Sequence, residues 1–145
     1  MNKQKVLILC TGNSARSQMA EGLLRSMAPD RFLVLSAGTK PSVVRPEAII
    51  VMRELGIDLS SHRSKSVDIY QDASFDFVIT VCDNANESCP VFFGKAERIH
   101  WSFEDPAAVE GDEAARLDSF RKIRDQIALR LRSFVDGPSE VIART

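Results

Sequence analysis

Four short runs of apolar and strand-forming residues recur along the chain, separated by longer stretches of mixed polarity. The runs are VLIL at 6–9, FLVL at 32–35, FDFVITV at 75–81 and ERIHWS at 97–102. Apolar and polar residues do not alternate strictly in them. This pattern predicts strands of a sheet that is buried on both faces.

The stretches between these runs show helical spacing. The first has an apolar residue at every fourth position, at Ala15, Met19, Leu23 and Met27, and stops at Pro29. The second, RPEAIIVMRELG at 45–56, places a proline at the first helical position and a glycine just past the end. A final amphipathic helix ends at DGP, with one apolar stripe formed by Leu117, Phe120, Ile127, Leu131 and Phe134.

The order of these elements, β-α-β-α-β-β-α, predicts an α/β fold with a parallel sheet flanked by helices on both faces. The 145 residues are 44% hydrophobic, enough for one core, and they contain no repeat or evident linker. We therefore expect a single domain over residues 1–145.

Charge and cysteine content narrow the function classes. The net charge of −1 and the pI of about 6.1 provide no basic field for nucleic acid or an anionic membrane. No apolar stretch is long enough to span a bilayer, and the N-terminus lacks a signal-peptide pattern, so we expect a cytosolic protein. Three cysteines in a reducing compartment favour reactive thiols over a disulfide scaffold. The default oligomeric state is a monomer.

The segment CTGNSARS at 10–17 follows the first strand run directly and leads into the first helix. Ligands of parallel α/β sheets bind beyond the carboxyl ends of the strands. Gly12 and Asn13 tolerate unusual backbone angles, so N–H groups can converge at a helix N-terminus to bind a tetrahedral oxyanion. The expected oxyanion-binding residues are Thr11, Gly12, Asn13, Ser14, Ala15, Arg16 and Ser17.

Arg16 adds a planar cation that can bind two oxygens of an anion at once. Its charge also predicts a lowered pKa for Cys10, and Ser14 or Ser17 can add a hydrogen bond to the sulfur. The alternative interpretation is a free cysteine at a strand end beside a surface arginine.

VLILCTGNSARSQMAEGLL resembles the opening of the low-molecular-weight tyrosine phosphatase superfamily, and especially its arsenate reductase branch coupled to thioredoxin. LSAGT at 35–39, GIDLSSHRSK at 56–65, VITVCDNANESCP at 78–90 and HWSFEDPA at 100–107 extend the similarity. The resemblance implies sheet order 2-1-3-4, nucleophilic attack by Cys10 and oxygen binding by Arg16 and the loop. It further implies that Asp105, stiffened by the proline after it, protonates the leaving oxygen. Glu104 is a neighbouring alternative.

The resemblance also implies that two further thiols supply the two electrons that convert arsenate to arsenite. Cys82 ends the third strand run as Cys10 ends the first, so both sulfurs would lie at the same sheet edge. Cys82 would attack Cys10, and Cys89 would attack Cys82 after the DNANES segment refolds, carrying the disulfide to thioredoxin. A buried passive pair or a metal ligand remains an alternative. No metal and no cofactor is expected.

Three positions depart from the resembled branch. Ala15 stands where many relatives carry a second loop cysteine. Ala107 and Ala108 follow Pro106 in place of the aromatic residues that stack a phenol in tyrosine phosphatases, which favours a small inorganic oxyanion. Lys65 stands where some reductases have an aspartate that binds potassium together with residues matching Asn13, Glu21 and Ser36. We therefore expect either that the Lys65 ammonium pairs with Glu21 in place of the ion, or that it is a solvated surface charge.

Two other functions stay open from the sequence. A phosphatase acting on phosphate monoesters needs only Cys10, Arg16 and Asp105, and weak phosphatase activity is compatible with a reductase. A non-enzymic arsenite or redox sensor would use the three thiols as ligands. The electron donor, thioredoxin or a small thiol, is not specified by the sequence, although Cys89 favours thioredoxin.

Overall fold

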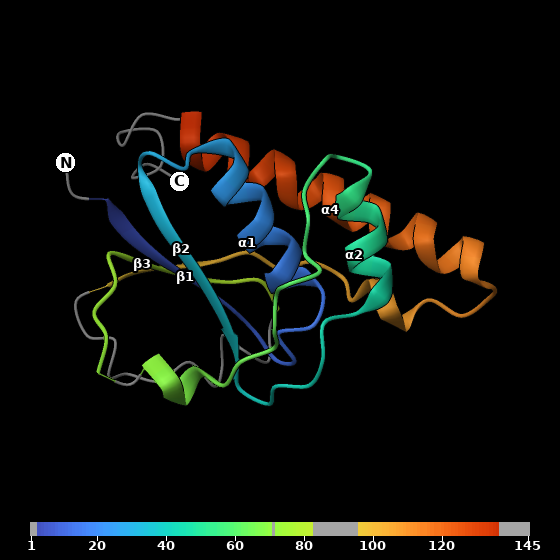
Figure 1. Cartoon of the computed structure of the whole chain (residues 1–145), viewed down its shortest axis with the longest axis horizontal. Coiled ribbons are helices and arrows are strands. Elements are labelled where there is room, and N and C mark those ends of the chain that lie inside the picture. The colour runs from blue at the N-terminus through green and yellow to red at the C-terminus, as the bar shows by residue number, and fades with distance from the viewer. Residues whose placement is uncertain (1–2, 71, 83–95, 137–145) are drawn as a thin grey trace.

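Four parallel strands form one sheet in the order β2-β1-β3-β4 (Figure 1). They are β1 (Gln4–Cys10), β2 (Phe32–Gly38), β3 (Phe77–Thr80) and β4 (Glu97–His100). This computed structural model describes residues 3–70, 72–82 and 96–136. All three strand pairings are parallel. The predicted strand direction and the implied strand order are both confirmed.

The helices are α1 (Arg16–Met27), α2 (Pro46–Arg53) and α4 (Glu113–Asp136), with short 3₁₀ turns η1 (Val67–Tyr70) and η3 (Pro106–Ala108). Helix α2 begins at its proline as predicted, and Gly56 lies just past its end at φ 76°. The N–H of Ile57 then donates to the Met52 carbonyl over 3.0 Å. This is the bond that closes a helix at a left-handed glycine. Within the described residues no helix is long and apolar enough to cross a membrane.

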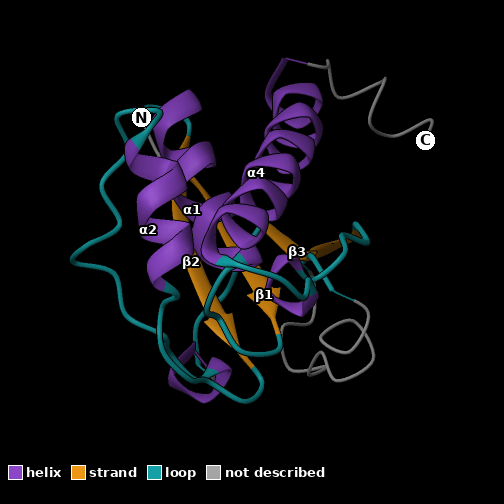
Figure 2. Ribbon diagram, turned by 90° about the vertical axis from the view of Figure 1, so that its right-hand side faces the viewer, coloured by secondary structure: helices purple, strands orange, loops and turns teal. Residues whose placement is uncertain are grey.

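The two faces of the sheet are covered by different parts of the chain. Phe134 of α4 packs against Phe32 of β2 and Phe77 of β3. Because strand side chains alternate, Val6, which pairs with Phe77, faces the same helices. Helices α1, α2 and α4 contact one another and gather on one side of the sheet (Figure 2), so within the described residues the α-helices predicted for both faces cover one of them.

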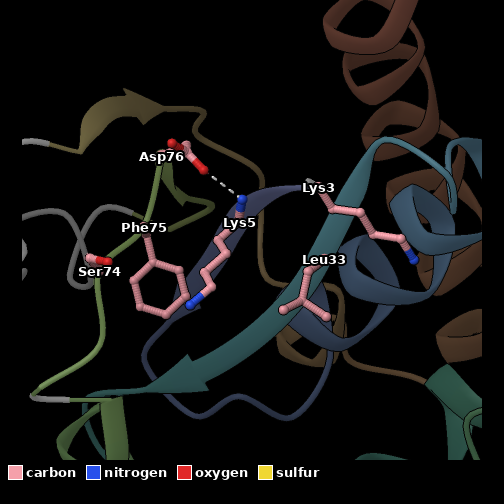
Figure 3. Close-up of a pocket in the computed structure, with 6 residues that line it drawn as sticks. All are labelled: Lys3, Lys5, Leu33, Ser74, Phe75 and Asp76. Carbon is pink, nitrogen blue, oxygen red and sulfur yellow. Dashed lines mark hydrogen bonds between the residues drawn. The ribbon is translucent and has the colours of Figure 1, made fainter. Parts of the chain in front are cut away.

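The opposite face is reached by η1 and the chain after it. There Lys5 and its strand partner Leu33 line an open cavity of about 520 Å³ with Lys3, Ser74, Phe75 and Asp76. Figure 3 shows the Lys5 backbone N–H directed at the Asp76 carboxylate, to which it donates over 2.8 Å. None of the described residues that line this cavity is a cysteine, and the cavity lies near the start of β1. The chemistry predicted from the sequence belongs to the other end of that strand.

Candidate active site

The loop at 10–17 joins the end of β1 to the start of α1, as Figure 1 shows at the lower edge of the sheet. Its carbonyl groups are held from outside by the chain that follows β2. The Thr11 carbonyl accepts from Lys40 N–H, that of Gly12 from Ser42 N–H and that of Ser14 from Arg45 N–H, over 2.8, 3.1 and 2.8 Å. The loop is therefore fixed through its acceptors.

The donors of the same loop are left free. In the part of the chain that the structure describes, the backbone N–H groups of residues 12–17 donate to no protein group. Helix α1 starts at Arg16, so the last of them belong to a helix N-terminus. Successive free N–H groups at such an end form a binding site for an oxyanion.

Asn13 sets the shape of the loop. It has φ 47°, whereas Gly12 does not adopt positive φ, so of the two candidates for unusual angles only Asn13 uses one. Its buried amide donates to the hydroxyls of Ser17 and Ser36, both over 2.9 Å. Its side-chain oxygen accepts from Lys65 N–H over 2.8 Å. These bonds tie the loop to β2 and to the chain after α2.

Gly38, at the end of β2, lets the loop approach. A Cβ atom at this position would lie 2.6 Å from the Thr11 carbonyl oxygen and 2.9 Å from the Asn13 nitrogen. Both contacts are to backbone, which cannot rotate away. The glycine in the LSAGT segment is therefore required by the active-site loop rather than by its own strand.

Cys10 and Cys82 come together at the ends of neighbouring strands β1 and β3. Both are buried thiols, with 3% and 5% of their surface exposed. The Thr11 N–H donates to the Cys82 sulfur over 3.2 Å, and the Thr11 hydroxyl lies 3.3 Å from the same sulfur. The expected placement of these two cysteines at one sheet edge is confirmed.

The electrostatics of Cys10 differ from the sequence-based expectation. Hydrogen bonding to Cys82 and burial raise the pKa of the Cys10 thiol well above its ordinary value, and the charge of Arg16 offsets this only in part. The prediction of a lowered pKa is therefore wrong for the unliganded site. It considered the arginine six positions away and omitted the second thiol.

Arg16 and Asp105 face a common cavity. This cavity measures about 220 Å³ and is lined by Cys10, Thr11, Gly12, Ser14, Ala15, Arg16, Arg45, Asp105 and Ala107. Arg16 donates from Nη1 to the Phe103 carbonyl over 3.0 Å, while its buried Nε finds no hydrogen-bond partner within the described part of the chain. A guanidinium N–H and neighbouring backbone N–H groups that are not used by the described residues are donors suited to binding an anion.

Asp105 precedes η3 and also lines the cavity. Its Oδ1 accepts the Ala107 N–H over 2.9 Å and so caps η3, as a turn residue would. The same residue also lines the cavity, whereas Glu104 is not among the lining residues. Of the two neighbouring carboxyl groups, only Asp105 therefore lines the cavity, and its role as proton donor stays a prediction.

A buried polar network supports the loop from below. Ser36 donates to the buried Glu21 carboxylate, which also pairs with Arg25 one helical turn later. His62 Nδ1 lies 2.9 Å from Gln18 Oε1. Gln18 in turn donates to the side-chain oxygen of Asn13 over 3.1 Å. Burial lowers the pKa of His62, and Glu21 opposes this only in part, so a neutral imidazole completes the network.

Lys65 does not make the ion pair expected of it. Its Nζ donates to the Arg63 carbonyl over 2.9 Å. Among the described residues, the lysine or arginine that pairs with Glu21 is Arg25. Burial lowers the pKa of Lys65 against the opposing effect of Glu21. Lys65 is therefore neither the predicted partner nor a fully solvated charge.

The comparisons with known proteins agree with this geometry. The model of the low-molecular-weight phosphotyrosine protein phosphatases matches residues 5–144. The chain belongs to this family. Within the family, an arsenate reductase of Halalkalibacterium halodurans is 41% identical over 136 residues, covering 94% of this chain and 98% of the relative.

Two solved structures of arsenate reductases are similar to most of this chain. An arsenate reductase in its phosphate-binding state superposes with a TM-score of 0.79 and 32% identity, covering 91% of this chain and 96% of that one. A thioredoxin-dependent arsenate reductase of Corynebacterium glutamicum gives a TM-score of 0.72 at 27% identity, covering 91% of this chain and 60% of the other. This chain is thus similar to arsenate reductases along most of its length.

The predicted site residue Cys89 lies outside the described residues, so its role stays a prediction. Arg45, by contrast, lines the cavity although no motif pointed to it. The available signal was its place in the loop after β2, whose carboxyl end meets the same sheet edge as that of β1.

Proposed function

We propose that this protein is an arsenate reductase that uses Cys10, Cys82 and Cys89 in sequence and is regenerated by thioredoxin. The observation that carries the proposal is the second buried thiol. Cys82 is hydrogen-bonded to Thr11 inside the anion loop, next to the nucleophile. Phosphate transfer needs one thiol, whereas a two-electron reduction needs two.

In the first step, arsenate enters the loop and is bound by the free N–H groups and by Arg16. The arriving oxyanion accepts the Cys10 proton, which the raised pKa keeps on the sulfur until then. The thiolate attacks arsenic and a sulfur–arsenic bond forms. One hydroxyl leaves as water with a proton from Asp105.

In the second step, the Cys82 sulfur attacks the Cys10 sulfur, and the Cys82 proton passes to an oxygen of the departing arsenic group. A disulfide forms, the sulfur–arsenic bond breaks, and its electron pair stays on arsenic, which is thereby reduced from arsenate to arsenite. The two thiols are the electron donors. The first disulfide is formed in a buried position, because both cysteines are buried.

In the third step, Cys89 attacks Cys82 and releases Cys10 as a thiol, and thioredoxin reduces the Cys82–Cys89 disulfide. Similarity to the thioredoxin-dependent reductase supports this assignment of the donor. The consequence for a cell is arsenic detoxification. No cofactor enters these steps.

The second candidate function is phosphatase activity on phosphate monoesters. It is favoured by the family to which the chain belongs and by the presence of Asp105 in the cavity. Ala107 lines the cavity where an aromatic residue would stack a phenol, so this activity is expected to be weak.

The deciding experiment measures arsenate-dependent NADPH oxidation with thioredoxin and thioredoxin reductase, alongside hydrolysis of a small aryl phosphate. Wild type should oxidise NADPH. Cys82→Ser should release no arsenite, whereas Cys89→Ser should release a single equivalent and stop. Full aryl-phosphate turnover by a wild type that does not oxidise NADPH would make the phosphatase the answer. Tight arsenite binding without turnover would identify a sensor.

A further inference from the structure

Arg45 is a second arginine at the anion cavity. It lies immediately before α2, with extended backbone at φ −68° and ψ 135°, and the following Pro46 restrains that conformation. Its N–H donates to the Ser14 carbonyl over 2.8 Å. The backbone of Arg45 is therefore fixed to the same loop whose free donors surround the cavity.

The guanidinium of Arg45 is uncommitted. Among the described residues it makes no hydrogen bond and no ion pair, although the residue is exposed and acidic side chains are abundant on this chain. Arg16, in contrast, already donates one N–H to the Phe103 carbonyl. The cavity is thus lined by Arg16, which is held in place by Phe103, and by Arg45, whose guanidinium is available to a ligand.

We propose that the Arg45 guanidinium binds the oxygens of the incoming tetrahedral oxyanion that the loop N–H groups do not hold. In-line attack by Cys10 leaves one oxygen of the tetrahedral anion opposite the sulfur and three around it, and these oxygens keep lone pairs on the side of the cavity that Arg45 lines. A planar fork with paired N–H donors matches two such oxygens. Arg45 is accordingly a substrate-binding residue that sets affinity for the anion, and the identity of that anion as arsenate rests on the proposed function.

The test measures anion binding without requiring reduction. Iodoacetamide alkylation of Cys10 is followed by mass spectrometry at increasing concentrations of inorganic phosphate, which protects the thiol when it fills the loop. Arg45→Gln should raise the half-protecting concentration by about tenfold, as expected for the loss of an exposed charge-assisted hydrogen bond. The half-protecting concentration of Arg45→Lys should lie between those of wild type and Arg45→Gln, because lysine keeps the charge and loses the paired N–H donors.

A matched control separates this effect from general charge. Arg53 is an exposed arginine at the other end of the same helix, away from the cavity. In Arg53→Gln, phosphate should protect Cys10 at the same concentration as in wild type. The difference between wild type and Arg45→Gln should shrink at high salt, since an exposed charge is screened, and a purely structural role would not show this. In the arsenate assay, KM should rise more than kcat falls.

Equal protection of Arg45→Gln and wild type would overturn the inference, as would an equal shift in Arg53→Gln. These outcomes are distinct from failure of the proposed function. If wild type does not reduce arsenate but the phosphate shift is present, the binding role stands and the reductase assignment falls. If arsenate is reduced and the phosphate shift is absent, the reductase assignment stands and the binding role of Arg45 falls.

Discussion

The backbone N–H of Thr11 donates a hydrogen bond of 3.2 Å to the sulfur of Cys82, a residue 71 positions later in the chain. The anion loop and the end of β3 are thereby joined at a reactive atom. Because Thr11 directly follows Cys10, this bond sets the position of the second thiol relative to the first.

Replacing Cys82 with alanine should make Cys10 more reactive at neutral pH. Hydrogen bonding to Cys82 is the largest cause of the raised Cys10 pKa, and Arg16, which lowers it, stays in place. A raised pKa keeps the thiol protonated, so alkylation of wild-type Cys10 should increase only as the pH rises above the ordinary thiol range. The pH profile of Cys82→Ala should move to lower pH. The profile of the unfolded protein is the reference, and an unchanged or higher midpoint would contradict the assignment.

Substitution of Gly38 should destabilise the active-site loop. The added Cβ of Gly38→Ala would overlap the Thr11 carbonyl and the Asn13 nitrogen, and the free energy of unfolding should fall by about 1–3 kcal/mol. Gly12→Ala is the control, since its nearest contact is 3.2 Å from the rotatable Ser14 hydroxyl. Urea unfolding should show a clearly smaller loss for Gly12→Ala. Equal losses of unfolding free energy in the two variants would mean that the backbone contacts at Gly38 do not require a glycine there.

Two substitutions at Asn13 should separate its backbone role from its side-chain role. Both Asn13→Ala and Asn13→Gly remove the amide that bonds Ser17 and Ser36, so each should lower the unfolding free energy by about 2–4 kcal/mol. The alanine variant should lose about 1 kcal/mol more unfolding free energy than the glycine variant, because a residue with a Cβ is disfavoured at a φ of 47°. Thermal unfolding of the two variants measures this difference. A more stable alanine variant would show that the backbone angle relaxes.

The reductase rate should be the same in potassium and in sodium salts. The Glu21 carboxylate is already bound by Ser36 and Arg25, and the charge of Lys65 lies near enough to act on it. A cation at this place would meet two positive side chains. Lys65→Asp reverses one of these charges and should introduce a dependence on potassium. A clear preference of wild type for potassium would refute the expectation.

The inner strands β1 and β3 were predictable because they are buried on both faces, whereas the same prediction is wrong for the edge strand β4, whose residues are exposed or half-buried. Val6, Leu7, Ile8 and Leu9 are all fully buried, which the uninterrupted run VLIL indicated. The limits of α2 followed from local chemistry as well, since Pro46 and Gly56 act within one turn of the chain. Such signals need no knowledge of distant contacts.

Features of the site that depend on distant segments were not predictable in the same way. The raised pKa of Cys10 comes from Cys82, and the partner of Glu21 is chosen by the geometry of α1. Arg45 reaches the cavity because the chain after β2 folds back onto the loop. A motif specifies which groups are present, whereas folding decides which of them are neighbours.

The hydrogen bond from Arg16 to the Phe103 carbonyl bears on how a very small substrate can be recognised. A tetrahedral ion has few atoms and no remote group whose contacts would offset the loss of motion of a long side chain. Here the guanidinium is ordered when the protein folds, by a contact that is independent of the ion. Its ordering entropy is thus lost once in the life of the molecule and not again at every catalytic cycle.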